Sequence, residues 1–456
     1  MKTKKRIGFI AMSGVRAHNA ELTALGLTLP GFVERNKQIA SLPSLGLLTL
    51  AGLTPNDRFD VEYHEIADLK KLPEIPTHFD LVAISTFTAQ FYEACAVADY
   101  FRTRNVPVVM GGITVSALVA ESLEHCTSVV IGEGEPLWPQ VLRDLEEDNL
   151  QRLYTSSPAG NFYLRDAPMP RFDLLNPEKY NRITVQTSRG CPHRCEFCAS
   201  SILLTPYYKV KPVEKVIAEI HAIKAIWPKP FIEFADDNSF IHRDHYKQLL
   251  RELAKENLRW FTETDIRVAE DAELLALLRD AGCQQILIGL ESPQRRSLDG
   301  IELKNNWKAR QQDHYKAAIA KIQSYGITVN GCFILGLDRD TPEIFGDVLH
   351  FVRDSGLYEV QVTFPTAFPG TPFYQRLKAE GRILRDHAWE LCTLFDININ
   401  PTCMSVAELQ TGFLGLVKQL YSETETQTRR RRFRRLLRTS PNFGRKTDTV
   451  EQLLAA

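Results

Sequence analysis

The sequence predicts an α/β protein in which two parallel sheets follow one another along the chain and a mostly helical region completes it. Two observations lead to this prediction. Short apolar runs alternate with longer amphipathic stretches over residues 6–149, and the same alternation returns from 183 to 366. This pattern is typical of βα units, in which helices join parallel strands. The chain has 456 residues, 44% of them hydrophobic, which is enough for two or three domains with their own cores.

Residues 1–150 predict a doubly wound parallel sheet. The runs expected as strands lie at 7–11, 61–63, 81–85, 106–110 and 128–131, separated by helical spacing at 45–53, 89–104, 115–124 and 137–145. Ligands of such sheets bind beyond the carboxyl ends of the strands. Each loop there could be an ordinary tight turn, but together they predict a binding site. Its expected residues are Ser85, Thr86, Thr88, Gly111, Gly112, Gly132, Glu133, Gly134 and Glu135.

The second half predicts a partial barrel. Residues 151–181 contain several prolines without clear periodicity, which is typical of an ordered linker. Residues 182–367 predict a partial (β/α)6 barrel, because strand-like runs at 183–187, 231–234, 259–262, 285–288, 328–334 and 360–363 are each followed by a helix-like stretch. Barrel sites form at the carboxyl ends of the strands. Residues 368–456 predict a mostly helical C-terminal region.

Three cysteines lie on the turn after the first barrel strand. Cys191, Cys195 and Cys198 have the spacing C-x3-C-x2-C. Three thiolates on one short loop can hold three irons of a cubane 4Fe-4S cluster and leave the fourth iron open. A zinc knuckle is the alternative, but closed zinc sites use four protein ligands. His193 could be the fourth, although it lies inside the loop.

Polar residues follow the other barrel strands, at 235–238, 263–267, 289–292 and 336–338. Alone, Asp236, Asp237 and Asn238 are typical of a helix N-cap or a site for a hard cation. Because the carboxyl ends of parallel strands meet at one edge, we expect these residues to lie beside the cysteine loop.

Composition excludes several classes of function. The net charge of -1 gives no reason to expect nucleic acid as a partner, and no apolar window approaches the length of a transmembrane segment. The cysteine count is nine, and three of the nine share one turn. This pattern favours a reducing, cytoplasmic location over a disulfide framework. The basic run from Arg429 to Arg435 can bind phosphates, but it is more typical of a solvated helix face.

At the cysteine loop the chain resembles the radical S-adenosylmethionine (SAM) enzymes, whose C-x3-C-x2-C signature has an aromatic residue before the last cysteine, here Phe197. The resemblance implies a 4Fe-4S cluster on the three cysteines and a SAM molecule that is cleaved reductively to a 5'-deoxyadenosyl radical. The implied SAM contacts are Phe197, Asp236, Asp237, Asn238, Arg267, Glu291, Gly331 and Gly336. Residues 235–238 depart from the family's glycine-glycine-glutamate loop, which leaves open which atom contacts SAM.

The N-terminal half resembles the cobalamin-binding domain of B12-dependent radical SAM enzymes. The similar stretches are "LPSLGLLTLAGL", "DLVAIST", "VPVVMGGITVSA" and "VVIGEGEPLWPQVLRDLE". The resemblance implies that the loops after the strands contact cobalamin. A D-x-H-x-x-G motif after the first strand is lacking, so no histidine is expected below the cobalt. His18 and His64 remain possible ligands.

The resemblance implies a radical SAM enzyme that methylates an unactivated carbon of a small, hydrophobic or natural-product substrate, with flavodoxin or ferredoxin as electron donor. The alternative is a rearrangement, dehydrogenation or coupling without methyl transfer. A further alternative is a sensor that binds SAM or a corrinoid without turnover, but such a protein would not need a cluster with an open iron. A methylthiotransferase would need three further N-terminal cysteines, and the N-terminal region has Cys95 and Cys126. Beyond the cofactors, no catalytic residue is assigned.

Overall fold

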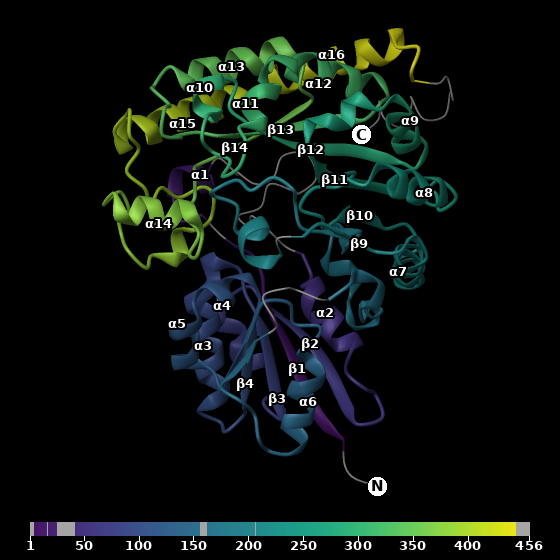
Figure 1. The fold of residues 1–456 in the computed structure, drawn as a ribbon, viewed down its shortest axis with the longest axis vertical. Helices are drawn as coiled ribbons and strands as arrows, with labels where there is room; N and C mark the ends of the chain where they lie inside the picture. Colours follow the sequence, from purple (N-terminus) through teal and green to yellow (C-terminus); the bar gives the residue numbers. More distant parts are fainter. Residues whose placement is uncertain (1–3, 16, 25–41, 156–161, 206, 444–456) are drawn as a thin grey trace.

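Two α/β units are stacked along the long axis of the molecule (Figure 1). The computed structural model describes residues 4–15, 17–24, 42–155, 162–205 and 207–443. The N-terminal unit lies at one end, and the second sheet with the C-terminal helices lies at the other. The linking stretch contains the short 3-10 helices η3 (Leu164–Asp166), η4 (Phe172–Leu174) and η5 (Pro177–Lys179).

The first sheet has six parallel strands in the order β2-β1-β3-β4-β5-β6. All the expected strands are present, and a further strand, β6, pairs with β5 within the stretch expected as a linker. The chain order reverses between β1 and β3, which makes their carboxyl ends the switch point where such sheets bind ligands. The strands are β1 (Lys5–Met12), β2 (Phe59–Ile66), β3 (Leu81–Ser85), β4 (Val108–Gly111), β5 (Ser128–Ile131) and β6 (Leu153–Thr155).

Helices cover both faces of this sheet because alternate strand residues point to opposite sides. Ile10 and Met12 of β1 pack in a core with residues of α3, whereas Ile7 and Phe9 pack with α2 and with Trp138 of α6. The helices of this unit are α2 (Leu45–Gly52), α3 (Phe91–Arg102), α4 (Ile113–Ala117), α5 (Val119–His125) and α6 (Trp138–Glu146), with the 3-10 helices η1 (Leu69–Glu74) and η2 (Thr88–Gln90). The short helix α1 (Ala20–Ala24) lies instead beside the second unit, where Leu22 joins the core of the second sheet (Figure 1).

The second sheet also has six parallel strands, in the order β14-β13-β12-β11-β10-β7. The strands follow chain order from one edge to the other, and the edge strands β7 and β14 lie at opposite ends. A separate two-stranded antiparallel pair, β8 and β9, flanks the cysteine loop. The strands are β7 (Ile183–Val185), β8 (Ser188–Arg189), β9 (Lys209–Val210), β10 (Phe231–Phe234), β11 (Arg259–Thr264), β12 (Cys283–Glu291), β13 (Thr328–Ile334) and β14 (Glu359–Thr363).

The helices after these strands bury a large common core, which includes Ile220 of α7, Leu250 of α8 and Ile319 of α12. They are α7 (Val213–Ile226), α8 (Arg243–Leu253), α9 (Ala272–Asp280), α10 (Arg295–Leu298), α11 (Trp307–Gln311), α12 (Tyr315–Ser324) and α13 (Ile344–Ser355), together with the π-helix η6 (Ser200–Leu204) and the 3-10 helices η7 (Ile266–Glu270) and η8 (Gln312–His314).

The C-terminal region is helical, with α14 (Pro372–Ala379), η9 (Trp389–Leu391), α15 (Val406–Leu420) and α16 (Glu423–Thr439). The basic run lies on α16, and part of it is structural. Arg429 is buried and donates to the carbonyl oxygen of Leu420 at 2.7 Å, and Arg432 donates to the carbonyl of Asp354 at 2.9 Å, near the end of α13. Its arginines therefore cap backbone carbonyls as well as face solvent.

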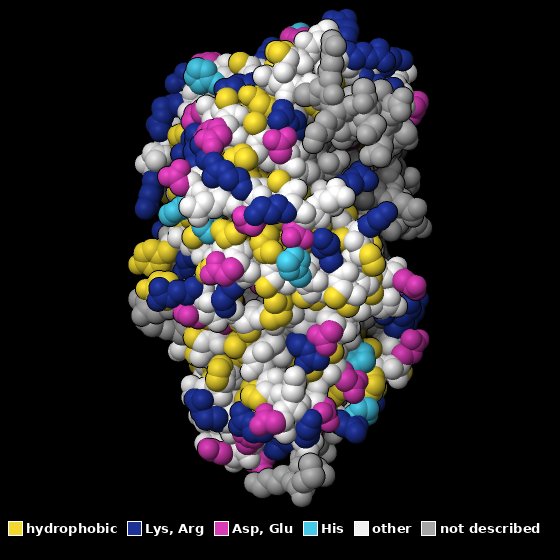
Figure 2. Space-filling model, turned by 90° about the vertical axis from the view of Figure 1, so that its right-hand side faces the viewer, with side chains coloured by type: hydrophobic (Ala, Val, Ile, Leu, Met, Phe, Trp, Pro, Cys, Tyr) yellow, Lys and Arg dark blue, Asp and Glu magenta, His cyan; other side chains and the backbone are white. Residues whose placement is uncertain are grey.

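Charges on the face shown in Figure 2 are mixed, with acidic and basic side chains interspersed over its length. This distribution agrees with the net charge of -1. Within the described parts of the chain, no helix is both long and apolar enough to cross a bilayer.

Four buried charges join the two units directly below the cysteine loop. Arg189 of β8 donates to Glu133 at 2.8 Å and to Glu135 at 2.6 Å, and both glutamates lie on the loop after β5. Lys209 of β9 donates to the second oxygen of Glu133 at 2.8 Å. We call Arg189, Lys209, Glu133 and Glu135 the junction cluster. Each of these side chains is 10% exposed or less.

Replacement of Arg189 by methionine tests the junction cluster. The change leaves two glutamates buried beside a single lysine, and breaking a buried pair of this kind costs about 3–5 kcal/mol. We expect the free energy of unfolding, measured with urea, to fall by that amount. The control is Arg251→Met, which removes a surface pair with Glu273 and costs less than about 1 kcal/mol. Equal losses in the two variants would contradict the role of the cluster.

Candidate functional site

The cysteine loop follows β8, and two neighbouring aspartates after β10 hold its base. The buried Asp236 carboxylate accepts hydrogen bonds from the backbone N–H groups of Thr187 at 2.7 Å and Ser188 at 2.8 Å. Asp237 accepts from the N–H of Gly190 at 2.6 Å and from the hydroxyl of Ser200. The loop is therefore tied to β10 immediately before its first cysteine.

A second segment packs on the other side of the loop. The stretch from Ile301 to Leu303 forms backbone hydrogen bonds with it, from Glu196 to Ile301 at 2.9 Å and from Leu303 to Arg194 at 2.8 Å. The ring of Trp307 stacks on His193 with centroids 4.3 Å apart. Sequence reasoning did not identify this segment, because nothing local indicates a contact with a loop about one hundred residues earlier in the chain.

The three cysteines line one cavity with no closed set of metal ligands. Among the described residues, no three His, Cys, Asp or Glu side chains converge as in a preformed metal site. His193 is engaged elsewhere, since one ring nitrogen lies 2.9 Å from Asp265 and the other 3.5 Å from Glu302. A fourth protein ligand for zinc is therefore not at hand. Three thiols without a fourth partner fit the open iron site of a 4Fe-4S cluster.

The thiols are protonated without a metal. Burial raises the pKa of Cys191 to about 11, and the amide of Asn238, which donates to its sulfur at 3.5 Å, opposes that shift. Burial also raises the pKa of Cys195. Binding of iron would therefore displace protons, and the side chain of Cys191 would exchange the Asn238 contact for the metal.

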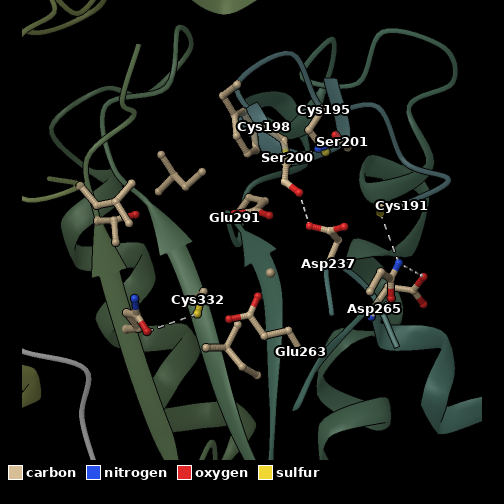
Figure 3. A pocket seen from close by; sticks show the side chains of 18 of the residues that line it. Cys191, Cys195, Cys198, Ser200, Ser201, Asp237, Glu263, Asp265, Glu291 and Cys332 are labelled. Atoms are coloured by element: carbon tan, nitrogen blue, oxygen red, sulfur yellow. Dashed lines mark hydrogen bonds between the residues drawn. The ribbon is translucent and has the colours of Figure 1, made fainter. Parts of the chain in front are cut away.

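The cavity beside these cysteines has a volume of about 560 Å³ and opens onto the carboxyl ends of the second sheet. Figure 3 shows Asp237, Glu263, Glu291 and Cys332 around its interior, below Cys195 and Cys198. Of the residues expected to contact SAM, those that line this cavity are Phe197, Asp237, Asn238 and Glu291.

Glu291 is held in an unusual conformation at the cavity wall. Its backbone φ of 62° lies in the left-handed region, where a side chain other than glycine costs free energy. The ammonium of Lys308 on α11 donates to its carboxylate at 2.6 Å and to the carbonyl of Gly289 at 2.8 Å. Burial acts to lower the pKa of Lys308, but the Glu291 carboxylate raises it above its ordinary value. The Lys308 ammonium therefore stays charged at neutral pH.

The remaining residues expected to contact SAM lie behind the cavity wall. Asp236 anchors the backbone as described above, and Arg267 pairs with Asp265 at 2.7 Å outside the lining. Gly331 and Gly336 are packed by leucines, since an added Cβ would lie 2.8 Å from Leu357 in one case and 2.9 Å from Leu409 in the other. Close packing is a sufficient reason for glycine at these two positions.

Asp265, which follows β11, links the cysteine loop to η7. Although burial acts to raise the pKa of this carboxyl, hydrogen bonds from His193 and Arg267 hold it below its ordinary value. The carboxylate therefore stays charged. Because it contacts both His193 of the cysteine loop and Arg267 of η7, it orients the loop against the second sheet.

A second cavity, of about 680 Å³, lies at the carboxyl edge of the first sheet. All the loop residues expected to contact cobalamin line it, namely Ser85, Thr86, Thr88, Gly111, Gly112, Gly132, Glu133, Gly134 and Glu135. The two cavities adjoin, because both are lined by Ser200, Phe368 and Leu394. His18 and His64 are not among the described residues that line the second cavity.

The structure adds residues that sequence reasoning did not single out. Asn330, Cys332 and Lys308 line the first cavity, together with Glu263 from the polar stretch 263–267 that was expected beside the cysteine loop. The Glu263 side chain is accessible from the cavity, but desolvation by the cavity walls and the charges of the neighbouring carboxylates together raise its pKa to about 8. The sequence contains one signal for Glu263, because it is the acidic residue of the strand "RWFTET". A carboxyl that faces the interior beside a sheet requires a function or a partner.

Comparison with known proteins agrees with this geometry. Residues 185–352 match the radical SAM superfamily, and residues 371–455 match a domain of unknown function (DUF4070). Bacteriochlorophyllide d C-12(1)-methyltransferase of Chlorobaculum tepidum is 25% identical over 386 residues, which cover 84% of this chain and 83% of that protein. Hopanoid C-2 methylase of Rhodopseudomonas palustris is 27% identical over 361 residues, covering 76% and 66%.

The fold is also similar to that of a solved structure. TsrM, a radical SAM methyltransferase from Kitasatospora setae with cobalamin and a [4Fe-4S] cluster bound, matches with a TM-score of 0.68 at 16% identity, over 93% of this chain and 90% of that one. The cysteine loop, the second sheet and the match over 185–352 together identify this part of the chain as a radical SAM domain.

Proposed function

We propose that the chain is a cobalamin-dependent radical SAM enzyme that methylates an unactivated carbon of a small-molecule substrate. The observation that carries this proposal is the shared wall of the two cavities, formed by Ser200, Phe368 and Leu394. When bound, the cluster supplies the electron that cleaves SAM, and the corrinoid supplies the methyl group. A substrate at the shared wall would be within reach of both.

The residues of this chain hold and orient the reactants. Cys191, Cys195 and Cys198 would bind the cluster, and Phe197, Asp237, Asn238 and Glu291 would contact SAM. The loops after β3, β4 and β5 would bind the corrinoid through backbone groups and small side chains. The Glu133 and Glu135 carboxylates are engaged by Arg189 and position their loop through the junction cluster.

Apolar side chains would shield the reaction from water. Phe364, Pro365, Phe368, Leu394 and Phe395 line the first cavity, and Phe368 and Leu394 of these also line the second. Excluding water limits quenching of a radical, and fixed orientation of the reactants supplies much of the rate. This wall favours a substrate with a hydrophobic scaffold, as the names of the two methylating relatives also suggest. A flavodoxin or ferredoxin is the proposed electron donor.

Replacement of Cys195 by alanine tests the radical half of the proposal. With two thiolates the cluster is not retained, so we expect the iron content and the formation of 5'-deoxyadenosine from SAM to fall to background. The measurement is chromatography of dithionite-reduced, anaerobically reconstituted protein. The control is Cys403→Ala, which removes an exposed cysteine outside both cavities and should leave the yield unchanged. Full activity of the Cys195 variant would refute the assignment.

Gly134→Leu tests the corrinoid half. An added Cβ at Gly134 meets only Leu50 side-chain atoms, at 3.6 Å or more, so the fold tolerates it while the longer side chain enters the second cavity. We expect hydroxocobalamin, followed by its visible absorbance, to bind wild type and to bind this variant at least about tenfold more weakly. The control is Gly415→Leu on the exposed face of α15, where a Cβ meets nothing within 4 Å. Absence of corrinoid binding to wild type would reject cobalamin dependence.

The mass of the product separates methylation from the other radical outcomes. With SAM bearing a trideuterated methyl group, a methyltransferase yields a product that carries the label. Rearrangement, dehydrogenation or coupling yields an unlabelled product. An unlabelled product together with 5'-deoxyadenosine would leave the radical SAM assignment in place and overturn the methyl transfer.

A further inference from the structure

Glu263 and Asn330 face the same cavity from the same level of the second sheet. Glu263 of β11 is in register with Leu287 of β12, which is in register with Asn330 of β13. All three residues line the first cavity. Two strand spacings separate Glu263 from Asn330, which is about 10 Å between their Cα atoms. Their side chains therefore stand on either side of Leu287, whose side chain forms the apolar surface of the cavity between them.

Glu263 differs from Glu233, Glu291 and Asp237 because, among the described residues, its carboxyl has neither an ion pair nor a hydrogen bond. Glu233 pairs with Arg182, and Glu291 pairs with Lys308 at 2.6 Å. Asp237 accepts from the Gly190 N–H at 2.6 Å. Among the residues that the structure describes, none forms a hydrogen bond or an ion pair with the Glu263 carboxyl. In Figure 3 its side chain points into the cavity, below Asp237 and Glu291.

The surroundings of Glu263 favour its neutral form. Although the side chain is accessible from the cavity, desolvation by the surrounding walls, together with the charges of Glu233, Asp237 and Glu291, raises its pKa to about 8, and Arg182 on the adjoining segment opposes them. The thiol of Cys332 also faces it and is kept protonated by burial. At pH 7 the Glu263 carboxyl is therefore an O–H donor as well as an acceptor.

Asn330 supplies the second observation. Its side chain is only 3% exposed, and its Oδ1 atom has no hydrogen-bond partner among the described residues. A buried acceptor without a partner is costly, and such groups in native proteins require an explanation. A ligand N–H group that enters the cavity would satisfy it.

We propose that Glu263 and Asn330 dock an amide-type group of the substrate, which donates its N–H to Asn330 Oδ1 and accepts the Glu263 O–H at its carbonyl oxygen. This inference rests on the proposed function, since it assigns one polar group to a substrate that is otherwise held by the apolar wall. Glu263 lies below Cys195 and Cys198 in Figure 3, and Phe368 and Leu394 of the shared wall line the same cavity, so an amide docked at the pair would leave the rest of the substrate free to extend to that wall.

Two small amides test the docking point directly. The probes are 2-pyrrolidinone, which has a ring N–H beside its carbonyl, and N-methyl-2-pyrrolidinone, which lacks the N–H. Their dissociation constants are measured by saturation-transfer NMR with the full-length, cluster-reconstituted protein at pH 7. We expect the N–H lactam to bind about fivefold more tightly, which is the effect of one hydrogen bond. Equal binding of the two probes would overturn the proposal.

Variants locate the binding. Asn330→Leu should abolish the preference between the two probes, and Glu263→Leu should weaken both by about fivefold. Glu263→Gln retains a donor and should bind the lactam nearly as well as wild type. The control is Glu270→Leu, an exposed carboxylate outside the cavity, which should change nothing. SAM affinity should stay within twofold in Glu263→Leu. A parallel loss of SAM affinity would assign the residue to the SAM pocket and overturn the proposal.

The pH dependence gives an independent readout. Because the pKa of Glu263 is raised to about 8, the neutral donor fraction falls about tenfold between pH 7 and pH 9, and lactam affinity of wild type should fall with it. Glu263→Gln should show no such fall. An equal fall in both proteins would overturn the donor role.

Thermal unfolding checks the same ionisation without any ligand. A carboxyl whose folded pKa lies above its unfolded value contributes stability below the unfolded pKa and loses it as the pH rises through the folded one. Glu263→Gln should therefore raise Tm relative to wild type more at pH 9 than at pH 5.

Corrinoid binding by the same preparations reports on the proposed function separately. Probe binding without corrinoid would leave this docking point standing, and corrinoid without probe binding would overturn the docking point alone.

Discussion

The arrangement of the cysteine loop depends on buried carboxylates that reach it from both units. Asp236 and Asp237 hold the backbone before Cys191 from the second sheet, and Glu133 and Glu135 hold Arg189 from the first. Buried charges are tolerated only where partners compensate them, so these contacts fix geometry more than they add stability. The loop therefore cannot shift relative to either sheet without breaking a buried pair. The two adjoining cavities owe their relative position to this constraint.

Charge pairing also divides the first cavity into two regions. Near the cysteines, Glu291 is matched by Lys308, and Asp265 by Arg267 and His193. The Asp265 carboxylate and the Lys308 ammonium stay charged, and these pairs suit a charged, zwitterionic ligand such as SAM. Deeper in the sheet, Glu263 has no ion-pair partner among the described residues, and its environment favours the neutral acid. The same cavity can thus offer fixed charges at its mouth and uncharged hydrogen-bonding groups at its floor, which suits two different ligands.

Much of the fold was predictable because apolar periodicity reports burial directly. Every strand expected from the pattern is present, and β6 was missed because a three-residue strand before a proline carries too little pattern to recognise. The residues of the second cavity were also predictable, since small residues after parallel strands meet at one edge. The assignments around the first cavity were less complete. Asp236 and Asp237 are neighbours in sequence, yet one anchors backbone and the other lines the cavity, because successive residues at a strand end point to opposite sides.

The sequence by itself determined the α/β class, the order of the two sheets and the loop that carries the cysteines, because local periodicity and ligand spacing are properties of short segments. Tertiary structure alone decided which groups share an environment. Lys308 meets Glu291, Arg189 meets Glu133, and Glu263 faces the cavity without a partner, all through contacts between residues distant in the chain. The pairing and the protonation of a buried carboxyl depend on the charges within a few ångströms of it. Those distances are set only when the sheets have packed.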